Sequence, residues 1–149
     1  MKLEIERKFL IHPDRLPRLV RGQKITQGYL SVDPAVRVRI RGVKSFVTIK
    51  FGNAFKREEY EWIISKSDST ALLKKCKFKI EKTRFKFHLN GDFWEIDVFE
   101  GENKGLVVAE IELKTEKQII QKPLWLDREV TNEVRYLNVN LAQKPYNNW

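Results

Sequence analysis

An alternation of apolar and polar residues with a period of two runs through most of this 149-residue chain, and it constrains the fold more than any other feature. In a β-strand, this period places apolar side chains on one face and polar side chains on the other. The pattern predicts eight strands and a ninth, weaker one, at 3–10, 25–32, 36–41, 46–51, 58–64, 79–88, 93–99, 107–115 and 125–131. We therefore expect a mainly β protein.

Few segments have a helical pattern. Residues 67–76 follow a Ser or Asp cap, and residues 132–142 repeat apolar positions with helical spacing, so these two segments are the predicted helices. Prolines limit any helix within 12–21 to a short turn. Asn90 and Gly91 separate two alternating runs, and this dipeptide is the strongest short signal for a β-hairpin.

The size and composition of the chain bound its class. A length of 149 residues with 42% apolar residues suits a single domain over 1–149. No apolar run approaches the roughly 20 residues of a membrane span, and the start lacks a signal-peptide pattern, so we expect a cytoplasmic protein without a membrane partner. One cysteine, Cys76, excludes an internal disulfide, and two histidines cannot build a Cys/His zinc site. Any metal would have carboxylate ligands.

The charged residues follow the strand period as well. The charged side chains expected on one common sheet face are Glu4, Glu6, Lys8, Arg37, Arg39, Arg41, Lys50, Glu59, Glu61, Lys82, Arg84, Glu95, Asp97, Glu110 and Glu112. In an open antiparallel sheet, such a charged face is commonly exposed to water. The charges nevertheless come in runs of one sign, and two arginines about 7 Å apart repel by about 0.6 kcal/mol in bulk water but about 2.4 kcal/mol at an effective dielectric near 20. In an enclosed lumen, these runs of like charge would need counter-ions.

Eight or nine strands can close into a barrel, which removes exposed edges and leaves room for one small ligand. The apolar outer face would then be covered by helices, by loops or by a second subunit. Carboxylates and basic rows in one cavity suit a polyphosphate complexed with metal. Oxygen ligands would hold Mg²⁺ or Mn²⁺, and arginine forks would hold phosphate oxygens.

The first strand contains the pattern E-x-E-x-K at Glu4, Glu6 and Lys8. With further motifs downstream in the same order, the chain resembles the CYTH domain, or triphosphate tunnel metalloenzyme, family. These motifs lie at 27–30, 36–39, 48–50, 57–61, 82–84, 94–97, 109–112 and 129–131. The resemblance implies an eight-stranded antiparallel tunnel with a few peripheral helices, in agreement with the alternation.

The resemblance also implies roles for individual residues. It implies two divalent ions, Mg²⁺ or Mn²⁺, with Glu4, Glu6, Glu110 and Glu112 as ligands and with Asp97 and Glu59 or Glu61 at the second ion or its water. The residues implied to bind the triphosphate are Lys8, Arg37, Arg39, Lys50, Lys82 and Arg84. The residues implied to act in catalysis are Lys8, Tyr29, Asp97 and Glu61.

Some of these residues have a structural alternative. Each carboxylate is a possible partner in a salt bridge of the lumen, and for Glu95 and Glu129 we regard this as at least as good an interpretation. Arg41, at a strand end beside a glycine, is expected to be a solvated charge. Tyr29 is either a packed aromatic or, paired with Lys8, a feature that resembles short bacterial members acting on inorganic tripolyphosphate.

The leading functional prediction is hydrolysis of a linear triphosphate, inorganic tripolyphosphate, to phosphate and pyrophosphate. A class IV adenylate cyclase and a thiamine or nucleoside triphosphatase are alternatives within the same fold. A noncatalytic binder of polyphosphate or nucleic acid is an alternative of another class, since the net charge is +9 and Trp62 and Trp149 could stack on bases. The interleaved carboxylates would repel phosphate without metal, so we expect a small-molecule triphosphate as the partner and no nucleic acid. Pairing of apolar outer faces suggests a homodimer.

Overall fold

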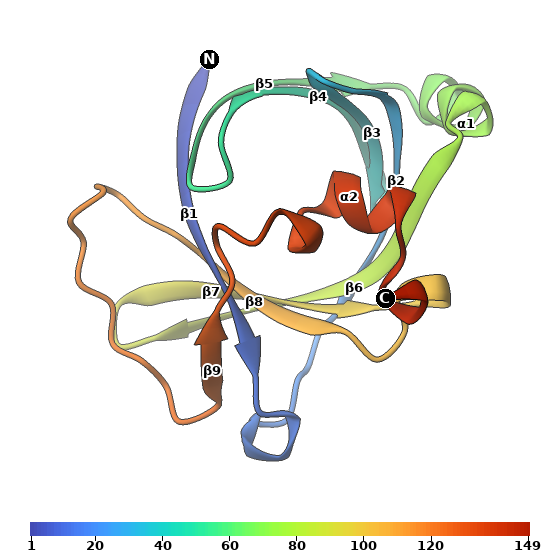
Figure 1. Ribbon diagram of the computed structural model, residues 1–149. Helices are drawn as coiled ribbons and strands as arrows, with labels where there is room; N and C mark the ends of the chain where they lie inside the picture. Colours follow the sequence, from blue (N-terminus) through green and yellow to red (C-terminus); the bar gives the residue numbers. More distant parts are fainter.

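The computed structural model describes all 149 residues and forms a closed antiparallel β-barrel with one additional strand and two short α-helices (Figure 1). The strands are β1 (Lys2–Ile11), β2 (Gln23–Val32), β3 (Ala35–Arg41), β4 (Lys44–Gly52), β5 (Lys56–Ile64), β6 (Phe78–Leu89), β7 (Asp92–Phe99), β8 (Val107–Glu112) and β9 (Leu126–Glu129). The helices are α1 (Lys66–Lys75) and α2 (Asn138–Gln143), with 3-10 turns η1 (Pro13–Arg15), η2 (Gly101–Asn103), η3 (Val134–Tyr136) and η4 (Tyr146–Asn148).

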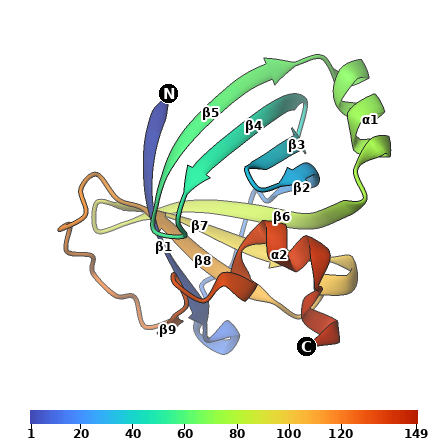
Figure 2. The same ribbon diagram turned by 45° about the horizontal axis from the view of Figure 1, so that its top comes forward.

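Strand β1 closes the barrel because it pairs with a different neighbour along each half of its length. Its first half pairs with β5, where Lys2 lies opposite Glu59, and its second half pairs with β8, where Lys8 lies opposite Glu110. The remaining strands follow in the order β5, β4, β3, β2, β6, β7 and β8, and Figure 2 shows the curved sheet that results. Strand β9 pairs with β1 beside the barrel. The nine predicted strands and the closed barrel are confirmed.

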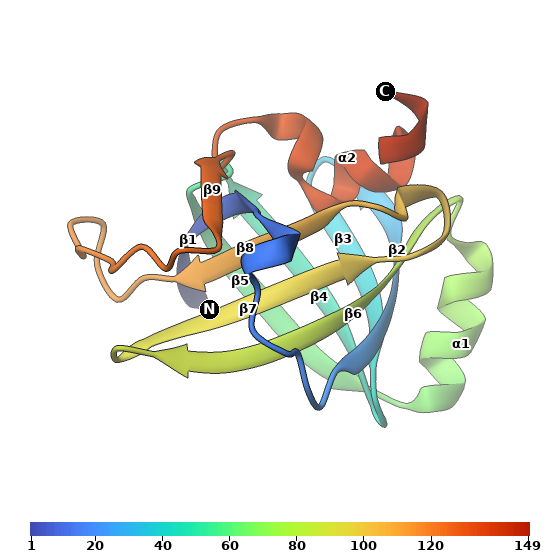
Figure 3. The ribbon, with the colours of Figure 1, turned by 90° about the horizontal axis from the view of Figure 1, so that it is seen from below.

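The apolar core of the protein is divided between the outside of the barrel and one end of its lumen. One cluster on the outer face of β1, β7 and β8 contains Phe9, Trp94 and Trp125. The η1 turn and the segment after it lie across these strands, as Figure 3 shows from below. A second cluster joins β6 and β8 to the C-terminal segment and includes Ile80 and Leu141. Ile80 shares its face of β6 with Lys82, so this second cluster fills one end of the lumen and the charged side chains line the rest.

Helix α1 packs against the outside of β2, β3 and β4, close to the predicted position. It begins after Ser65, whose side-chain oxygen accepts a hydrogen bond from the backbone N–H of Asp68 at 2.9 Å. The helix approaches β2 most closely at Gly28, where an added Cβ would lie 2.7 Å from the Cβ of Cys76 and 3.0 Å from Leu73. Only glycine leaves room for this approach.

The predicted helix over 132–142 is broken in the structure. Residues Val134–Tyr136 form a 3-10 turn, Leu137 is extended at φ −66° and ψ 135°, and α2 begins only at Asn138. Tyr136 is buried in the second core cluster while Val134 is exposed, so the chain is anchored through Tyr136 and not along the predicted face. Packing therefore overrides the helical spacing.

One predicted strand end is wrong, and the predicted hairpin turn is confirmed. Strand β8 ends at Glu112, three residues before its predicted end. The hairpin between β6 and β7 is confirmed, since Asn90 and Gly91 both have positive φ angles, 51° and 83°, as a type I′ turn requires. Neither helix has the length and apolar character that a membrane-crossing helix needs.

We expect Gly28→Ala to lower the free energy of unfolding by about 1–3 kcal/mol, because the new methyl group would overpack the contact between β2 and α1. Thermal or urea unfolding measures this change. Leu30→Ala, at an exposed position of the same strand, is the matched control and should change stability far less. Equal effects of the two variants would contradict the close packing of α1 at Gly28.

Candidate active site

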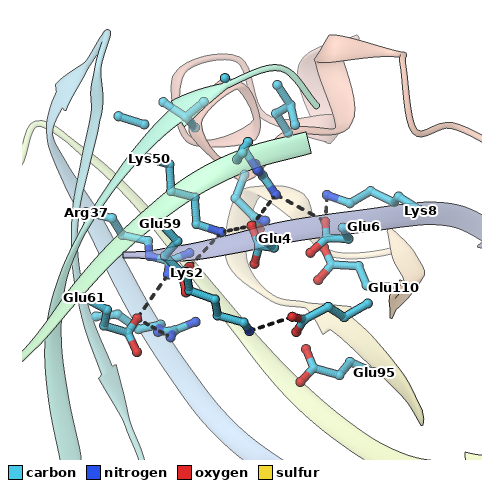
Figure 4. A pocket seen from close by; sticks show the side chains of 18 of the residues that line it. Lys2, Glu4, Glu6, Lys8, Arg37, Lys50, Glu59, Glu61, Glu95 and Glu110 are labelled. Atoms are coloured by element: carbon cyan, nitrogen blue, oxygen red, sulfur yellow. Dashed lines mark hydrogen bonds and ion pairs between the residues drawn. The ribbon is translucent and has the colours of Figure 1, made fainter. Parts of the chain in front are cut away.

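A cavity of about 530 Å³ occupies the barrel lumen and is lined by residues of all eight barrel strands. Figure 4 shows carboxylates and cationic side chains of the lining pointing toward one another in this cavity. Every site residue predicted from the sequence lines this cavity except Asp97. The alternation therefore places these side chains on one enclosed surface, as expected for a closed barrel.

The charges that line the cavity are nearly balanced. The lining contains ten cationic residues, Lys2, Lys8, Arg37, Arg39, Arg41, Lys50, Arg57, Lys82, Arg84 and Lys86. It contains eight carboxylates, Glu4, Glu6, Asp33, Glu59, Glu61, Glu95, Glu110 and Glu112. Most of the net charge of +9 thus lies outside the cavity.

Asp97 lies behind two cations and does not reach the cavity. Its carboxylate accepts hydrogen bonds from the Nζ of Lys82 at 2.5 Å and from the Nε and Nη2 of Arg84 at 2.7 Å each. Burial alone would raise the pKa of Asp97, but the adjacent Arg84 and Lys82 hold it below its usual value. Both carboxylate oxygens are occupied and the residue is fully buried, so the structure shows Asp97 as a support for two cations, and its metal and catalytic roles stay predictions. It positions Lys82 and Arg84.

Lys8 and Glu110 form a buried ion pair between β1 and β8. The Lys8 Nζ lies 3.0 Å from Oε1 of Glu110 and donates a hydrogen bond to the backbone carbonyl of Tyr136 at 3.1 Å. Burial lowers the pKa of Lys8, but Glu110 and Glu6 outweigh it and raise the pKa above its usual value. Lys8 is therefore held charged at the cavity wall.

A second network joins β1 to β4 and β5. The Lys50 Nζ lies 2.7 Å from Glu4 and 3.2 Å from Glu59, and an Nη2 atom of Arg57 lies 3.1 Å from Glu4 and 3.5 Å from Glu6. Arg57 is absent from the predicted site. The sequence was sufficient to predict it, because Arg57 precedes Glu59 by two residues and therefore shares its face of β5. Glu4 lies directly opposite Arg57 in the strand register.

Glu6 is the lumen carboxylate whose negative charge is balanced least by neighbouring cations. Burial and then the charge of Glu110 raise its pKa to about 7, although Lys8 and Arg57 act in the opposite direction. It also lies directly opposite Glu112 on β8, and Lys2 draws that side chain away at 2.6 Å. Like charges opposite each other on neighbouring strands are destabilising, so a cation near Glu6 would be stabilising.

The donor set fits a hard divalent cation by its chemistry, since its ligands would all be carboxylate oxygens. No three carboxylates converge on one point in the structure. Each lies instead with a cationic side chain, as Glu4 does with Lys50.

An arginine row on β3 faces the carboxylates across the lumen. The Arg39 Nη2 lies 3.1 Å from Glu61, and Arg37 donates to the hydroxyl of Thr48 at 3.2 Å. Burial, and then the charge of Arg37, lower the pKa of Arg39 to about 9. The Nε groups of both arginines are buried without a hydrogen-bond partner. Such unpaired donors are costly, so the row is suited to an anion.

Tyr29 is both a packed aromatic and a cavity residue. It is buried, yet it lines the lumen, and its hydroxyl oxygen accepts a hydrogen bond from the Nε2 of Gln27 at 2.9 Å. Burial raises the pKa of Tyr29 above its usual value. Its hydroxyl group thus keeps its proton and can donate it in a hydrogen bond.

Three charged residues with alternative interpretations can now be placed. Arg41 is half-buried at the cavity wall with its guanidinium 4.9 Å from the ring centre of Phe46, so the expected solvated charge is only partly exposed. Glu95 forms the expected salt bridges, with Arg84 and with Lys86. Glu129 forms a salt bridge, but with Arg7 and outside the lumen, at 2.6 Å, because Arg7 interrupts the charged face of β1.

The segment that leads into α2 forms one end of the cavity. Leu137, Asn138 and Val139 line it, and the side-chain oxygen of Asn138 accepts a hydrogen bond from the Nζ of Lys82 at 3.1 Å. Figure 1 shows this segment lying against the barrel beside β6. No motif in the sequence pointed to Asn138, since its role depends on where the C-terminal segment folds.

Comparison with known proteins agrees with this geometry. The sequence matches the CYTH domain over residues 2–146. The chain belongs to the CYTH domain family. An inorganic triphosphatase of Acetivibrio thermocellus is 43% identical over an alignment covering 100% of this chain and 99% of that protein. An inorganic triphosphatase of Nitrosomonas europaea is 35% identical, with 93% of this chain and 96% of that protein covered.

Solved structures share this fold, and one of them agrees with the family assignment. A crystal structure of an inorganic triphosphatase superposes with a TM-score of 0.71 at 34% identity, covering 95% of each chain. The structure of a Pyrococcus horikoshii protein has a TM-score of 0.60 at 21% identity and covers 76% of this chain and 80% of its own. The second of these similarities concerns the fold alone.

We expect Asp97→Asn to lower the free energy of unfolding by about 3–5 kcal/mol, because it leaves Lys82 and Arg84 buried without their shared counter-charge. Glu95→Gln is the control, since Glu95 also pairs with Arg84 but is partly exposed, and it should cost less. Urea denaturation of both variants measures the difference. Equal losses would be inconsistent with Asp97 as the buried anchor of the two cations.

Proposed function

We propose that this CYTH protein hydrolyses inorganic tripolyphosphate to phosphate and pyrophosphate in a reaction that depends on a divalent metal ion. One observation supports this most directly: an enclosed cavity in which unpaired arginine donors of β3 face the carboxylates of β1 and β8. The two inorganic triphosphatases similar to this chain align with it over 93% of its length or more. The cavity volume lies within the usual range for small-molecule sites.

The triphosphate would be held by the basic side of the lumen. Arg37 and Arg39 carry Nε groups without partners, and their guanidinium forks suit phosphate oxygens. Lys82 and Arg84 are fixed from behind by Asp97, so they keep their places when an anion enters. Lys50 is shared between Glu4 and Glu59, and a phosphate group would compete for it.

The carboxylate side of the lumen would hold two divalent ions, either Mg²⁺ or Mn²⁺. The residues that would hold them are Glu4, Glu6, Glu110 and Glu112, with Glu59 at the second ion. A bound divalent cation supplies charge neutralisation at phosphate oxygens and lowers the pKa of a coordinated water. Among these carboxylates, the charge of Glu6 is balanced least by neighbouring cations. We therefore expect a bound metal ion to change the pKa of Glu6 more than that of the other ligands.

The residues of this chain would act chiefly by positioning and charge. Phosphoryl transfer passes through a loose transition state, so fixed donors around the phosphate oxygens contribute most. Lys8 is held charged by Glu110, and Tyr29 keeps a hydroxyl proton to donate. Glu61 already accepts from Arg39 and Thr48, which orients it at the lumen for an attacking water. No covalent nucleophile is required.

Product analysis tests the proposal. Purified protein would be given tripolyphosphate, ATP and thiamine triphosphate in parallel, each with Mg²⁺, Mn²⁺ or EDTA. We expect metal-dependent release of phosphate, fastest from tripolyphosphate, and none with EDTA. Cyclic AMP formation from ATP, or metal-dependent binding without turnover of any substrate, would overturn the proposal.

Glu6→Gln should abolish most metal-dependent turnover at limiting metal, because it removes a charge that the cation would compensate. Glu129→Gln is the matched control, since Glu129 lies outside the lumen and should leave turnover unchanged. Phosphate release over a metal titration distinguishes them. Full activity of Glu6→Gln at low metal would remove Glu6 from the metal site.

Asn138→Ala should lower kcat/KM for tripolyphosphate by about 2–10-fold, because Lys82 loses one hydrogen bond but keeps Asp97. Gln143→Ala, on the exposed side of α2, is the control and should have no effect. Steady-state kinetics measures both. An unchanged kcat/KM in Asn138→Ala would show that α2 does not position Lys82.

A further inference from the structure

The two ends of the lumen differ in what covers them. At one end, Tyr29 and Ile80 are buried in the second core cluster together with Tyr136 of the C-terminal segment. Arg37 pairs with Tyr29 in the strand register and therefore lies next to this covered end. Arg41 is the last residue of β3, four residues further along, which is about 13 Å in an extended strand. It thus lies toward the opposite end.

The opposite end is exposed to solvent. Lys2 and Lys86 lie there, because they are six and four residues along their strands from Lys8 and Lys82, which contact the C-terminal segment. Their side chains are 56% and 41% exposed, and the nearby Phe93 is 36% exposed. We call this end the open mouth, and its cavity residues are Lys2, Arg41, Lys86 and Phe93. A substrate reaches the lumen here.

Arg41 is the one cation of the cavity wall without a carboxylate partner. Each of the other nine lysines and arginines that line the cavity has a carboxylate oxygen within 3.9 Å. At the open mouth, Lys2 pairs with Glu112 at 2.6 Å and Lys86 pairs with Glu95 at 3.4 Å. The charge of Arg41 is therefore the one at the mouth that an incoming anion meets without displacing a carboxylate.

The side chain of Arg41 is nevertheless held in place. Its guanidinium lies 4.9 Å from the ring centre of Phe46, and Phe46 is buried, so the ring is a fixed support for a cation–π contact. Arg39 lies 5.6 Å from the same ring and pairs with Glu61 at 3.1 Å. Two guanidinium groups thus share one ring, but only that of Arg39 has a counter-charge.

The open mouth determines which part of a triphosphate meets Arg41. The C-terminal segment covers the other end, so a nucleoside or thiamine group on a triphosphate would extend through the open mouth. The phosphate group nearest the mouth would then be esterified, with one ionised oxygen. In inorganic tripolyphosphate, the group at the mouth is a terminal phosphate. Its second oxygen ionises with a pKa of about 6, which adds about one negative charge near neutral pH.

We propose that Arg41 binds the terminal phosphate group of inorganic tripolyphosphate at the open mouth and thereby selects this substrate over triphosphates that are esterified there. A guanidinium fork suits two oxygens of one phosphate group, and its attraction grows with the charge of that group. Arg37, Arg39 and Arg41 lie about 7 Å apart in sequence along one face of β3, so the row continues from the mouth to the interior. This inference rests on the proposed function and adds a specificity residue to it.

Steady-state kinetics with tripolyphosphate and ATP tests this inference. Arg41→Gln should lower kcat/KM for tripolyphosphate about tenfold, mainly through KM, and that for ATP less than about threefold, because the esterified phosphate carries less charge. Lys44→Gln is the matched control, since Lys44 lies opposite Arg41 in the same hairpin, is exposed and does not line the cavity. It removes the same charge and should leave the ratio of the two kcat/KM values unchanged. Arg41→Lys keeps the charge without the fork and should lose less than Arg41→Gln.

Calorimetric titration of tripolyphosphate in EDTA separates this inference from the proposed function. Arg41→Gln should raise the Kd about tenfold and Lys44→Gln should not, and thermal unfolding shows that both variants fold. This result in a protein without turnover would refute the proposed function and leave the inference standing. Equal effects of the two variants, equal losses for tripolyphosphate and ATP in Arg41→Gln, or a wild type that binds no tripolyphosphate would each overturn the inference.

Discussion

Closure of the sheet by β1 is the constraint on which the rest of the structure depends. Because β1 pairs with β5 and with β8, the inward faces of eight strands meet across one lumen, and those of all but β2 carry charged side chains. In that enclosure, a charge without a partner is costly, so nearly every carboxylate lies beside a lysine or arginine. The same closure turns the apolar faces of β1, β7 and β8 outward, where the first core cluster forms, while the second cluster forms where the C-terminal segment covers one end of the lumen.

The ion pairs of the lumen differ in what they do. Asp97 is fully buried and holds Lys82 and Arg84 from behind, so this part of the wall is built before any ligand arrives. Glu6 and the arginine row are different, because Glu6 has little compensation and the Nε groups of Arg37 and Arg39 have no partner. A complex of a cation and a polyphosphate would satisfy both at once, and this links the packing of the barrel to its proposed chemistry.

The C-terminal segment covers one end of the lumen and contacts its charged wall. Tyr136 packs in the second core cluster while its carbonyl accepts from Lys8, and Asn138, two residues later, reaches Lys82. Between these two residues the chain is extended at Leu137. The residues just after β9 also contact β1, because the hydroxyl of Thr131 accepts a hydrogen bond from the backbone N–H of Lys8 at 3.0 Å.

Sequence alone determined the strands, the polar lumen and most of its residues, because a period of two assigns each side chain to a face before any contact forms. Arg57 followed from the same rule, two residues before Glu59, but was not predicted. Tertiary structure alone decided that Asp97 supports the cations and does not face the cavity, since this depends on the register that places Arg84 beside it. It also decided that Asn138 contacts Lys82, because long-range packing determines where the C-terminal segment lies.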